Sequence, residues 1–507
     1  MSGRNSIKVF PSSSGPRRAF LASALFVALC AAGVTAPRAS DRTLPPSVPP
    51  PQPIALPTPD VRTLANGLQV LVVERHSLPV LTLRLLVRAG AESDPAGLPG
   101  IAQFTAGLLN EGTEHRSAIE LAEAIDSAGG TVDSSVGWDS SFLVLTVLAD
   151  HAPLAFDLMA DMAVHPAFYP AEVERGRRQT LSALDVLHND PSYLADTVMH
   201  QVLLAGTPYG HPADGTVDSV KRARPEDLAA FHAREFVPSR SVLAVVGDIA
   251  PASALELAAR YFGGWRAAPA AAPSGPKAAL SPPAVAPPQA NPSPSVVIVD
   301  KPDAVQTEIR VANAGIPRSS PDYVALTVAN QILGGPASNR LFSDLRGEHG
   351  LTYGASSDLD CYLVAGTWEA KTSTRTPETA KTVHRVLDQM KRLRDRPISA
   401  QELQQAVDYL IGHQALDFET SDGIADQFLD LMADHLPLDT WSAFPAALRR
   451  LTPDEVWQAT RRHLDPDQAT VVLVGNAVEF EKDMRKLGPT RVIPIDRLDL
   501  GSSTLVR

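Results

Sequence analysis

Few residues of this 507-residue chain are placed to hold a metal ion. One cluster, Glu111-x-x-Glu114-His115, has residue types that bind divalent cations, because carboxylates and imidazoles are metal ligands. Gly112 and Thr113 stand inside it and predict the end of a helix, so its side chains need not share one face. We interpret it as a solvated loop. Four further histidines lack paired metal spacing and are interpreted as structural or solvated: His200, His211, His232 and His413.

The two cysteines, Cys30 and Cys361, restrict the chemistry further. Cys30 lies in the predicted leader, so the mature chain would hold a single thiol, which excludes a cysteine zinc site, a Cys-x-x-Cys redox pair and an internal disulfide. Cys361 begins an apolar, strand-like run, Cys361-Tyr362-Leu363-Val364. It is therefore interpreted as a buried structural thiol rather than a reactive one.

Composition and charge bound the class of protein. A hydrophobic content of 44% and a charged content of 20% are typical of a soluble globular protein, and the length predicts two or more domains. The formal charge is −12; five of the 45 basic residues lie in residues 1–40, and none of the 57 acidic ones does. An acidic surface repels phosphate groups, so we expect no nucleic-acid partner and no membrane partner beyond an export signal.

Residues 1–39 are predicted to be a signal peptide. Arg17 and Arg18 precede an apolar stretch, residues 19–32, that is too short to span a bilayer. Arg17-Arg18-Ala19-Phe20-Leu21 also resembles a twin-arginine export signal. The alternative is an uncleaved membrane anchor, because no position after the apolar stretch matches a signal-peptidase cleavage site well. We therefore expect a periplasmic or secreted protein of a bacterial envelope, with proline-rich residues 40–60 as a spacer.

The rest of the chain reads as two similar halves. Nine prolines between residues 266 and 294 predict an extended linker. A helix from Pro225 and a strand over 242–247 recur 228 residues later, from Pro453 and over 470–475, and a match over 24 positions without a gap indicates duplication. The predicted boundaries are a first domain over 61–265, a linker over 266–294, a second domain over 295–490 and a tail over 491–507.

Local signals predict the elements of the first half. Asn66-Gly67 predicts a tight turn between two strands, and residues 80–87 a further strand. Ser117-x-x-Glu120 is a capping box that opens a helix ending at Gly129-Gly130. Residues 132–148 then predict a hairpin and 152–164 an amphipathic helix. This mixed order favours an α+β fold of two homologous sandwich halves, each a mostly antiparallel sheet covered by helices.

Several runs resemble the pitrilysin/insulinase family of metallopeptidases over nearly the whole mature chain. The resemblance implies related α+β halves that form half of a clamshell chamber around short or unfolded peptides. The runs that carry it are Arg88-Ala89-Gly90-Ala91-Glu92, residues 97–113, Thr207-Pro208-Tyr209-Gly210-His211-Pro212, and Leu333-Gly334-Gly335 to Arg340-Leu341-Phe342.

Active members of that family carry His-x-x-Glu-His on a helix of the first half, and a glutamate ligand further along. Two histidines four apart bind zinc from one helical face, while the motif's glutamate polarises the bound water. The matching stretch here is Gln103-Phe104-Thr105-Ala106-Gly107, and Ser182 and Ala183 stand where the third ligand is expected. Glutamine is a poor ligand, alanine cannot act as a base, and glycine has no side chain. The resemblance therefore implies that this chain binds no metal ion.

The second half keeps the family's Arg-x6-Tyr pair as Arg346 and Tyr353. In active members this pair faces the zinc, holds the substrate backbone and stabilises the oxyanion. A permanently charged guanidinium and a phenolic hydroxyl donor suit that task. The alternative for any isolated pair of these types is a surface arginine and a core tyrosine.

In two-chain members of the family, one subunit carries the zinc motif and the other only the Arg–Tyr pair. We therefore predict the zinc-less subunit of a heterodimeric peptidase, inactive alone, that offers Arg346 and Tyr353 to a zinc-bearing sister subunit for peptide hydrolysis. One alternative is a non-catalytic scaffold or peptide-binding subunit of an envelope complex. Another is a self-sufficient zinc peptidase.

Overall fold

The structure, a computed structural model, describes residues 55–266, 294–336 and 339–506. The predicted signal peptide (1–39), most of the predicted spacer (40–60) and nearly all of the predicted linker (266–294) lie outside the described residues. Within them, the strands sort into two sheets of six strands each.

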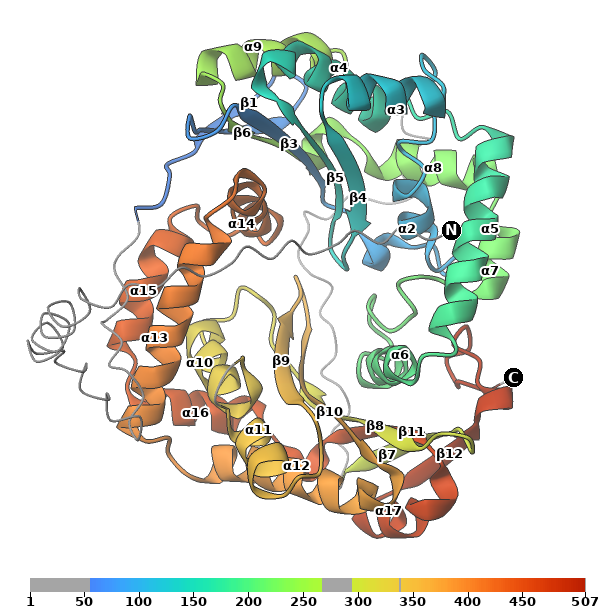
Figure 1. Cartoon of the computed structure of the whole chain (residues 1–507), viewed down its shortest axis with the longest axis vertical. Helices are drawn as coiled ribbons and strands as arrows, with labels where there is room; N and C mark the ends of the chain where they lie inside the picture. The colour runs from blue at the N-terminus through green and yellow to red at the C-terminus, as the bar shows by residue number, and fades with distance from the viewer. Residues whose placement is uncertain (1–54, 267–293, 337–338, 507) are drawn as a thin grey trace, which may run out of the picture. The chain divides into compact units, whose positions relative to one another are not determined.

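The first sheet is built from the N-terminal half, in the order β1-β2-β6-β3-β5-β4 (Figure 1). Only β2 and β6 pair in parallel; the other neighbours are antiparallel. At the predicted turn between β1 and β2, Gly67 has a φ of 94° and the Asn66 amide donates to the carbonyl of Phe262. The bounds are β1 Asp60–Thr63, β2 Gln69–Glu74, β3 Val80–Val87, β4 Thr131–Val136, β5 Ser141–Leu148 and β6 Ser241–Gly247.

The second sheet repeats this topology in the order β12-β7-β11-β8-β10-β9. Its parallel pair β7–β11 corresponds to β2–β6. The outer position next to that pair is filled differently, because β1 is antiparallel to β2 whereas β12 is parallel to β7. The bounds are β7 Ser295–Asp300, β8 Gln306–Ala314, β9 Ala355–Cys361, β10 Gly366–Arg375, β11 Thr470–Gly475 and β12 Thr490–Pro494.

Strand β12 corrects the predicted tail over 491–507. Thr490–Pro494 completes the second sheet, and Leu500 and Leu505 are buried against it at 6% and 2% exposure. The second domain therefore does not stop at residue 490. The sequence placed this boundary wrongly because a five-residue edge strand with one buried side chain carries little periodic signal.

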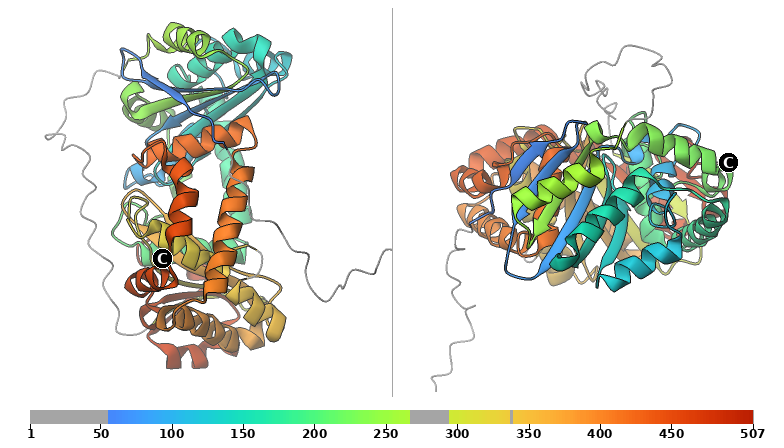
Figure 2. Two further views of the ribbon diagram at one scale, coloured as in Figure 1. Left: turned by 90° about the vertical axis from the view of Figure 1, so that its left-hand side faces the viewer. Right: turned by 90° about the horizontal axis from the view of Figure 1, so that it is seen from above.

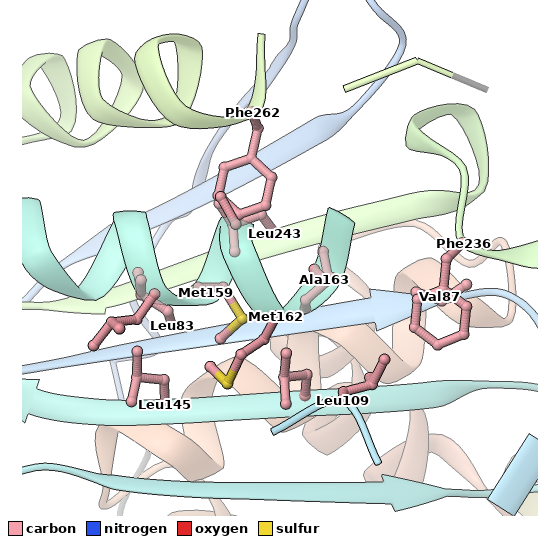
Figure 3. Close-up of a cluster of buried hydrophobic side chains, with 14 of the residues drawn as sticks. Leu83, Val87, Leu109, Leu145, Met159, Met162, Ala163, Phe236, Leu243 and Phe262 are labelled. Carbon is pink, nitrogen blue, oxygen red and sulfur yellow. The ribbon is translucent and has the colours of Figure 1, made fainter. Parts of the chain in front are cut away.

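One face of each sheet packs on helices from its own half. In the first half, α4 and α9 lie over the strands, as the view from above in Figure 2 shows, and Met159, Phe262 and Leu243 meet in the core drawn in Figure 3. The strands β6 and β11 are buried along their whole length, because both of their faces are covered, and most of their residues are apolar. These covering helices are α3 Ala118–Ser127, α4 Ala152–Val164, α8 Pro225–Glu235 and α9 Pro251–Phe262, and in the second half α10 Tyr323–Gly334, α12 Thr379–Asp395, α16 Pro453–His463 and α17 Glu481–Leu487.

The opposite face of each sheet packs on a helix from the other half. Helix α14 (Ser421–Ala433) places Ile424, Phe428 and Leu429 on β2, β3 and β6 of the first sheet. Helix α6 (Pro191–Leu203) places Leu194 and Val198 on β7, β8 and β11 of the second sheet. Figure 1 shows α14 beside β3 and α6 beside β8. Each half therefore completes the core of the other.

The predicted elements of the first half are confirmed. The capping box is formed, with Ser117 accepting from Glu120 N–H and the Glu120 carboxylate accepting from Ser117 N–H. The repeat is confirmed as well, because α8 and α16 begin 228 residues apart and each leads into a central strand. The remaining helices are α2 Ile101–Ala106, α5 Pro170–Leu187, α7 Val217–Arg222, α11 Arg340–Phe342, α13 Ala400–Asp417 and α15 Thr440–Arg450.

The predicted fold class is confirmed: α+β, with two mostly antiparallel sheets covered by helices. Across the described ranges, we find no helix with both the length and the apolar character needed to cross a bilayer.

We expect Phe428→Ala to destabilise the whole protein by about 3–5 kcal/mol, because it leaves a cavity between α14 and the first sheet. Thermal unfolding should show one cooperative transition shifted to lower temperature, since neither sheet keeps its cover without the other half. The exposed Val478 provides the control, Val478→Ala, which should leave the transition unchanged. Two separate transitions, of which only one moves, would contradict mutual completion of the cores.

Candidate functional site

Arg346 lies in a π-helical turn, Ser343–Glu348, that continues from α11. Its guanidinium carbon lies 4.5 Å from the centre of the Tyr353 ring and 5.1 Å from that of Phe342. Its Nη1 donates to the carbonyl oxygen of Tyr353 at 2.8 Å. The structure thus brings together the two residues that the sequence singled out. The remaining guanidinium donors of Arg346 stay available, because the side chain is exposed.

Tyr353 is 84% exposed, so it is not the core tyrosine of the alternative interpretation. It lies just before β9, the edge strand of the second sheet, and on the rim of a groove of about 830 Å3. The end of α10 at Gly334 and Gly335 and one face of α6 form other walls of this groove. A large exposed aromatic side chain beside a groove and a sheet edge is typical of a binding surface.

Sequence reasoning missed the charged floor of this groove. Arg310 on β8 is 3% exposed and donates to Asp196 of α6 at 2.6 Å. Lys371 on β10 pairs with the buried Glu369 at 3.4 Å and with Asp358 at 3.2 Å. Burial raises the pKa of Glu369 to about 7 despite these cations. The available signal was a pair of charged residues two positions apart in a strand-like run, as in Glu369 and Lys371, because such residues share one face of a strand and a buried charge needs a partner.

The stretch that matches the zinc motif lies at the end of a short helix. Helix α2 ends at Ala106, and Gly107 caps it, with its N–H donating to Gln103 O. Ala106 is 1% exposed, Gln103 is half-buried and Gly107 is exposed. None of these three side chains can supply the imidazole or carboxylate that a zinc ion requires.

Helix α5 carries Ser182 and Ala183, and both residues are exposed. The helix packs on the α2 segment nearly two turns earlier, at Gly176, where a Cβ atom would collide with Leu108 and crowd Phe104. Arg177 lies over the Phe104 ring at 5.9 Å and donates to the carbonyls of Val220 and Ala223. Side-chain packing and an arginine thus join α2, α5 and α7.

The Glu111-x-x-Glu114-His115 cluster does not converge. Glu111 pairs with Arg175, Glu114 lies 3.6 Å from His165, and His115 contacts Asp161 at 2.6 Å. Among the described residues, one group has ligand atoms within 4.8 Å of one another, namely Asp344, Glu348 and His349. Arg385 forms two hydrogen bonds to the Asp344 carboxylate, and this cation disfavours a metal ion there.

All four scattered histidines have structural contacts, and for His413 these are a stacked Tyr409 ring, with 5.5 Å between ring centres, and Asp417 at 3.8 Å. His232 is 9% exposed, with Nε2 at 3.0 Å from the carbonyl of Ala163. His200 stacks on Trp138, with 5.5 Å between ring centres, and its Nε2 lies 3.3 Å from the Tyr362 hydroxyl. His211 lies 3.3 Å from the Asp94 carboxylate. Burial lowers the pKa of His200 and of His232 to about 4, so both are neutral near pH 7.

Two duplicated α+β halves, each of which covers the other's sheet with a helix, define the class of protein by its fold. Residues 69–216 match the family model described as insulinase (peptidase family M16), and residues 222–410 match the one described as the M16 inactive domain. The chain belongs to the M16 peptidase family.

Proteins similar to this chain include some named as zinc proteases and one named as a non-peptidase homolog. An uncharacterized zinc protease of Mycobacterium tuberculosis is 28% identical over 62% of this chain and 70% of its own length. The non-peptidase homolog YmxG of Helicobacter pylori is 24% identical over 80% of this chain and 91% of its own. The uncharacterized zinc protease YmxG of Bacillus subtilis is 22% identical over 71% and 84%.

Solved structures show the same fold. The peptidase M16 inactive domain from Pseudomonas fluorescens superposes with a TM-score of 0.75 and 28% identity, over 82% of this chain and 98% of that one. A protease from Helicobacter pylori has a TM-score of 0.75 at 19% identity, over 83% of this chain and all of its own.

We expect the chain, purified alone under mild conditions, to carry less than one equivalent of zinc, because its matching helix offers glutamine, alanine and glycine. Elemental analysis of the protein measures this, with a His-x-x-Glu-His relative purified in parallel as the positive control. One equivalent of zinc that is lost in Gln103→Ala would show that this helix binds metal after all. Zinc lost instead in His349→Ala would assign it to the Asp344 group.

We expect the stability of the protein to fall, relative to His232→Gln, as the pH drops from about 6.5 to about 4. Over this range the unfolded chain binds a proton at residue 232 and the folded chain does not, so acid favours unfolding. Urea unfolding at a series of pH values measures the difference, and comparison with the variant cancels the carboxyl groups common to both. A constant difference across this window would show that His232 titrates normally.

Proposed function

We propose that this chain is the zinc-less subunit of a heterodimeric M16 peptidase, exported to the bacterial envelope. In this proposal it binds no metal ion, and a zinc-bearing sister subunit supplies the metal for peptide hydrolysis. Arg346 and Tyr353 then act in trans, on substrate held between the subunits. The degenerate positions are Gln103, Ala106, Gly107, Ser182 and Ala183.

The observation that carries the proposal is the presentation of Arg346 and Tyr353. The Tyr353 side chain is 84% exposed beside an exposed arginine, so the isolated fold gains little of the free energy that burial of an aromatic ring would provide. The cation–π contact and the hydrogen bond to Tyr353 O hold the two side chains together without burying either. Such a pair is suited to a ligand outside the chain.

The chemistry of the two side chains fits a carbonyl that acquires negative charge. Arg346 stays protonated at any physiological pH and keeps donors beyond the one given to Tyr353 O. The phenolic hydroxyl of Tyr353 is a directed donor of a single hydrogen bond. Together they would hold a peptide carbonyl and stabilise its oxyanion, while the partner's metal activates water.

The edge strand β9 supports a peptide as the ligand. Within the described chain β9 pairs with one strand, β10, and its other edge meets α10 at Ser357, whose carbonyl accepts from the Asn330 amide. An extended peptide could add along the rest of that edge. Tyr353 lies two residues before β9, which places its side chain near the start of any peptide strand bound there. The groove bordered by Ser356 and Asp358 would receive its side chains.

The second candidate function is a non-catalytic scaffold or peptide-binding subunit of an envelope complex. The same groove and edge strand favour it, since binding along β9 needs no metal. The two functions differ in whether Arg346 and Tyr353 change a rate or only an affinity.

We expect Arg346→Ala and Tyr353→Phe each to lower the cleavage rate of a reconstituted complex by about 100-fold or more, because each removes an oxyanion donor. The partner is a sister bearing His-x-x-Glu-His, and the measurement is kcat for a fluorogenic peptide. Peptide affinity for the lone chain is measured alongside.

The matched control is Arg375→Ala, a second exposed arginine of the same half, which should change neither rate nor affinity. Unchanged kcat in both Arg346→Ala and Tyr353→Phe would refute the catalytic role. If those variants weaken peptide binding to the lone chain while no zinc-bearing sister associates with it, the scaffold is the function.

A further inference from the structure

One buried carboxylate, that of Asp344, anchors the turn that carries Arg346. Asp344 is 4% exposed and lies two residues before Arg346. Arg385, on α12, donates to it from Nε at 2.9 Å and also from Nη2. A guanidinium that grips both carboxylate oxygens fixes orientation as well as distance. The π-helical turn is thereby attached to the helix that covers the second sheet.

The rest of the segment up to Tyr353 is held from the same side. Leu351 is 4% exposed, its N–H donates to Leu345 O at 2.8 Å, and its carbonyl accepts from the Thr374 hydroxyl at 2.7 Å. Arg346 and Tyr353, by contrast, are exposed on the other side. The buried residues Asp344 and Leu351 thus fix the segment, and the exposed residues Arg346 and Tyr353 form the pair that it presents.

A similar ion pair occurs in the first half with its charges exchanged. Arg116 pairs with Asp157 on α4 at 2.5 Å. Arg116 also pairs with the buried Asp161 of the same helix at 2.6 Å. Helices α4 and α12 each cover the sheet of their own half. In each half, an ion pair therefore ties a connecting segment to a helix that covers the sheet, which is the role of a structural pin.

We propose that Asp344 and Arg385 are positioning residues, which set the place and orientation of Arg346 and Tyr353 for a ligand outside the chain. The consequence for catalysis rests on the proposed function, whereas the attachment of the turn by the Asp344–Arg385 ion pair, here called the pin, does not. Without the pin, the π-helical turn loses its attachment to α12 and Arg346 samples other orientations. Displacement of a catalytic group by about 1 Å can cost on the order of 100-fold in rate.

Hydrogen–deuterium exchange of the lone, full-length chain tests the pin directly. In Arg385→Met we expect the amides of residues 345–354 to exchange about tenfold faster than in the unaltered chain, with α12 and the sheet unchanged. Arg385→Lys keeps the charge but not the two-armed grip, so it should lie between the two. It also serves if Arg385→Met fails to fold. The matched control is Asp157→Ala, which breaks the first-half pair and should leave residues 345–354 unaffected.

Kinetics of the complex test the consequence. Arg385→Met should lower kcat about 10- to 100-fold with little change in KM, because substrate still binds along β9. Unchanged exchange over residues 345–354 in the folded Arg385 variants would overturn the pin, whatever the kinetics. If exchange is faster in Arg385→Met but the rate of the complex is unchanged by Arg346→Ala, the pin is supported and the proposed catalytic role is refuted.

Discussion

Two sheets with apolar surfaces on both faces, in one chain, are the constraint on which the structure depends. Buried aliphatic side chains fill both faces of β6 and β11, so each sheet needs helices on two sides. The chain meets this need by exchange, with α14 from the second half on the first sheet and α6 from the first half on the second. The surface that bears Arg346 and Tyr353 therefore depends on residues from both halves of the sequence.

The sequence predicted the elements well where their signals are local. The Asn66-Gly67 turn, the capping box at Ser117 and the 228-residue repeat each depend on neighbouring residues, and each is confirmed. It did not predict which sheet α6 and α14 cover, because an apolar helical face does not specify its partner. It also ended the second domain before β12, whose Thr490–Pro494 reads as an irregular segment when taken alone.

For the candidate site, the sequence identified Arg346 and Tyr353, and the structure adds their contact and exposure. The groove floor escaped notice, because Asp196 and Arg310 are 114 residues apart and meet only through the helix exchange. Asp344 and Arg385 were not predicted either, because they are 41 residues apart in the second half and no motif links them.

The outer strands of the two sheets also bear on how the protein behaves at high concentration. Unpaired strand edges invite identical strands to stack, the first step toward insoluble fibres. Strand β4 carries Asp133, and β9 carries Asp358 and Asp360. Charged side chains on an edge strand disfavour pairing with an identical strand, so β4 and β9 can lie at the edges of their sheets without making the protein adhere to itself.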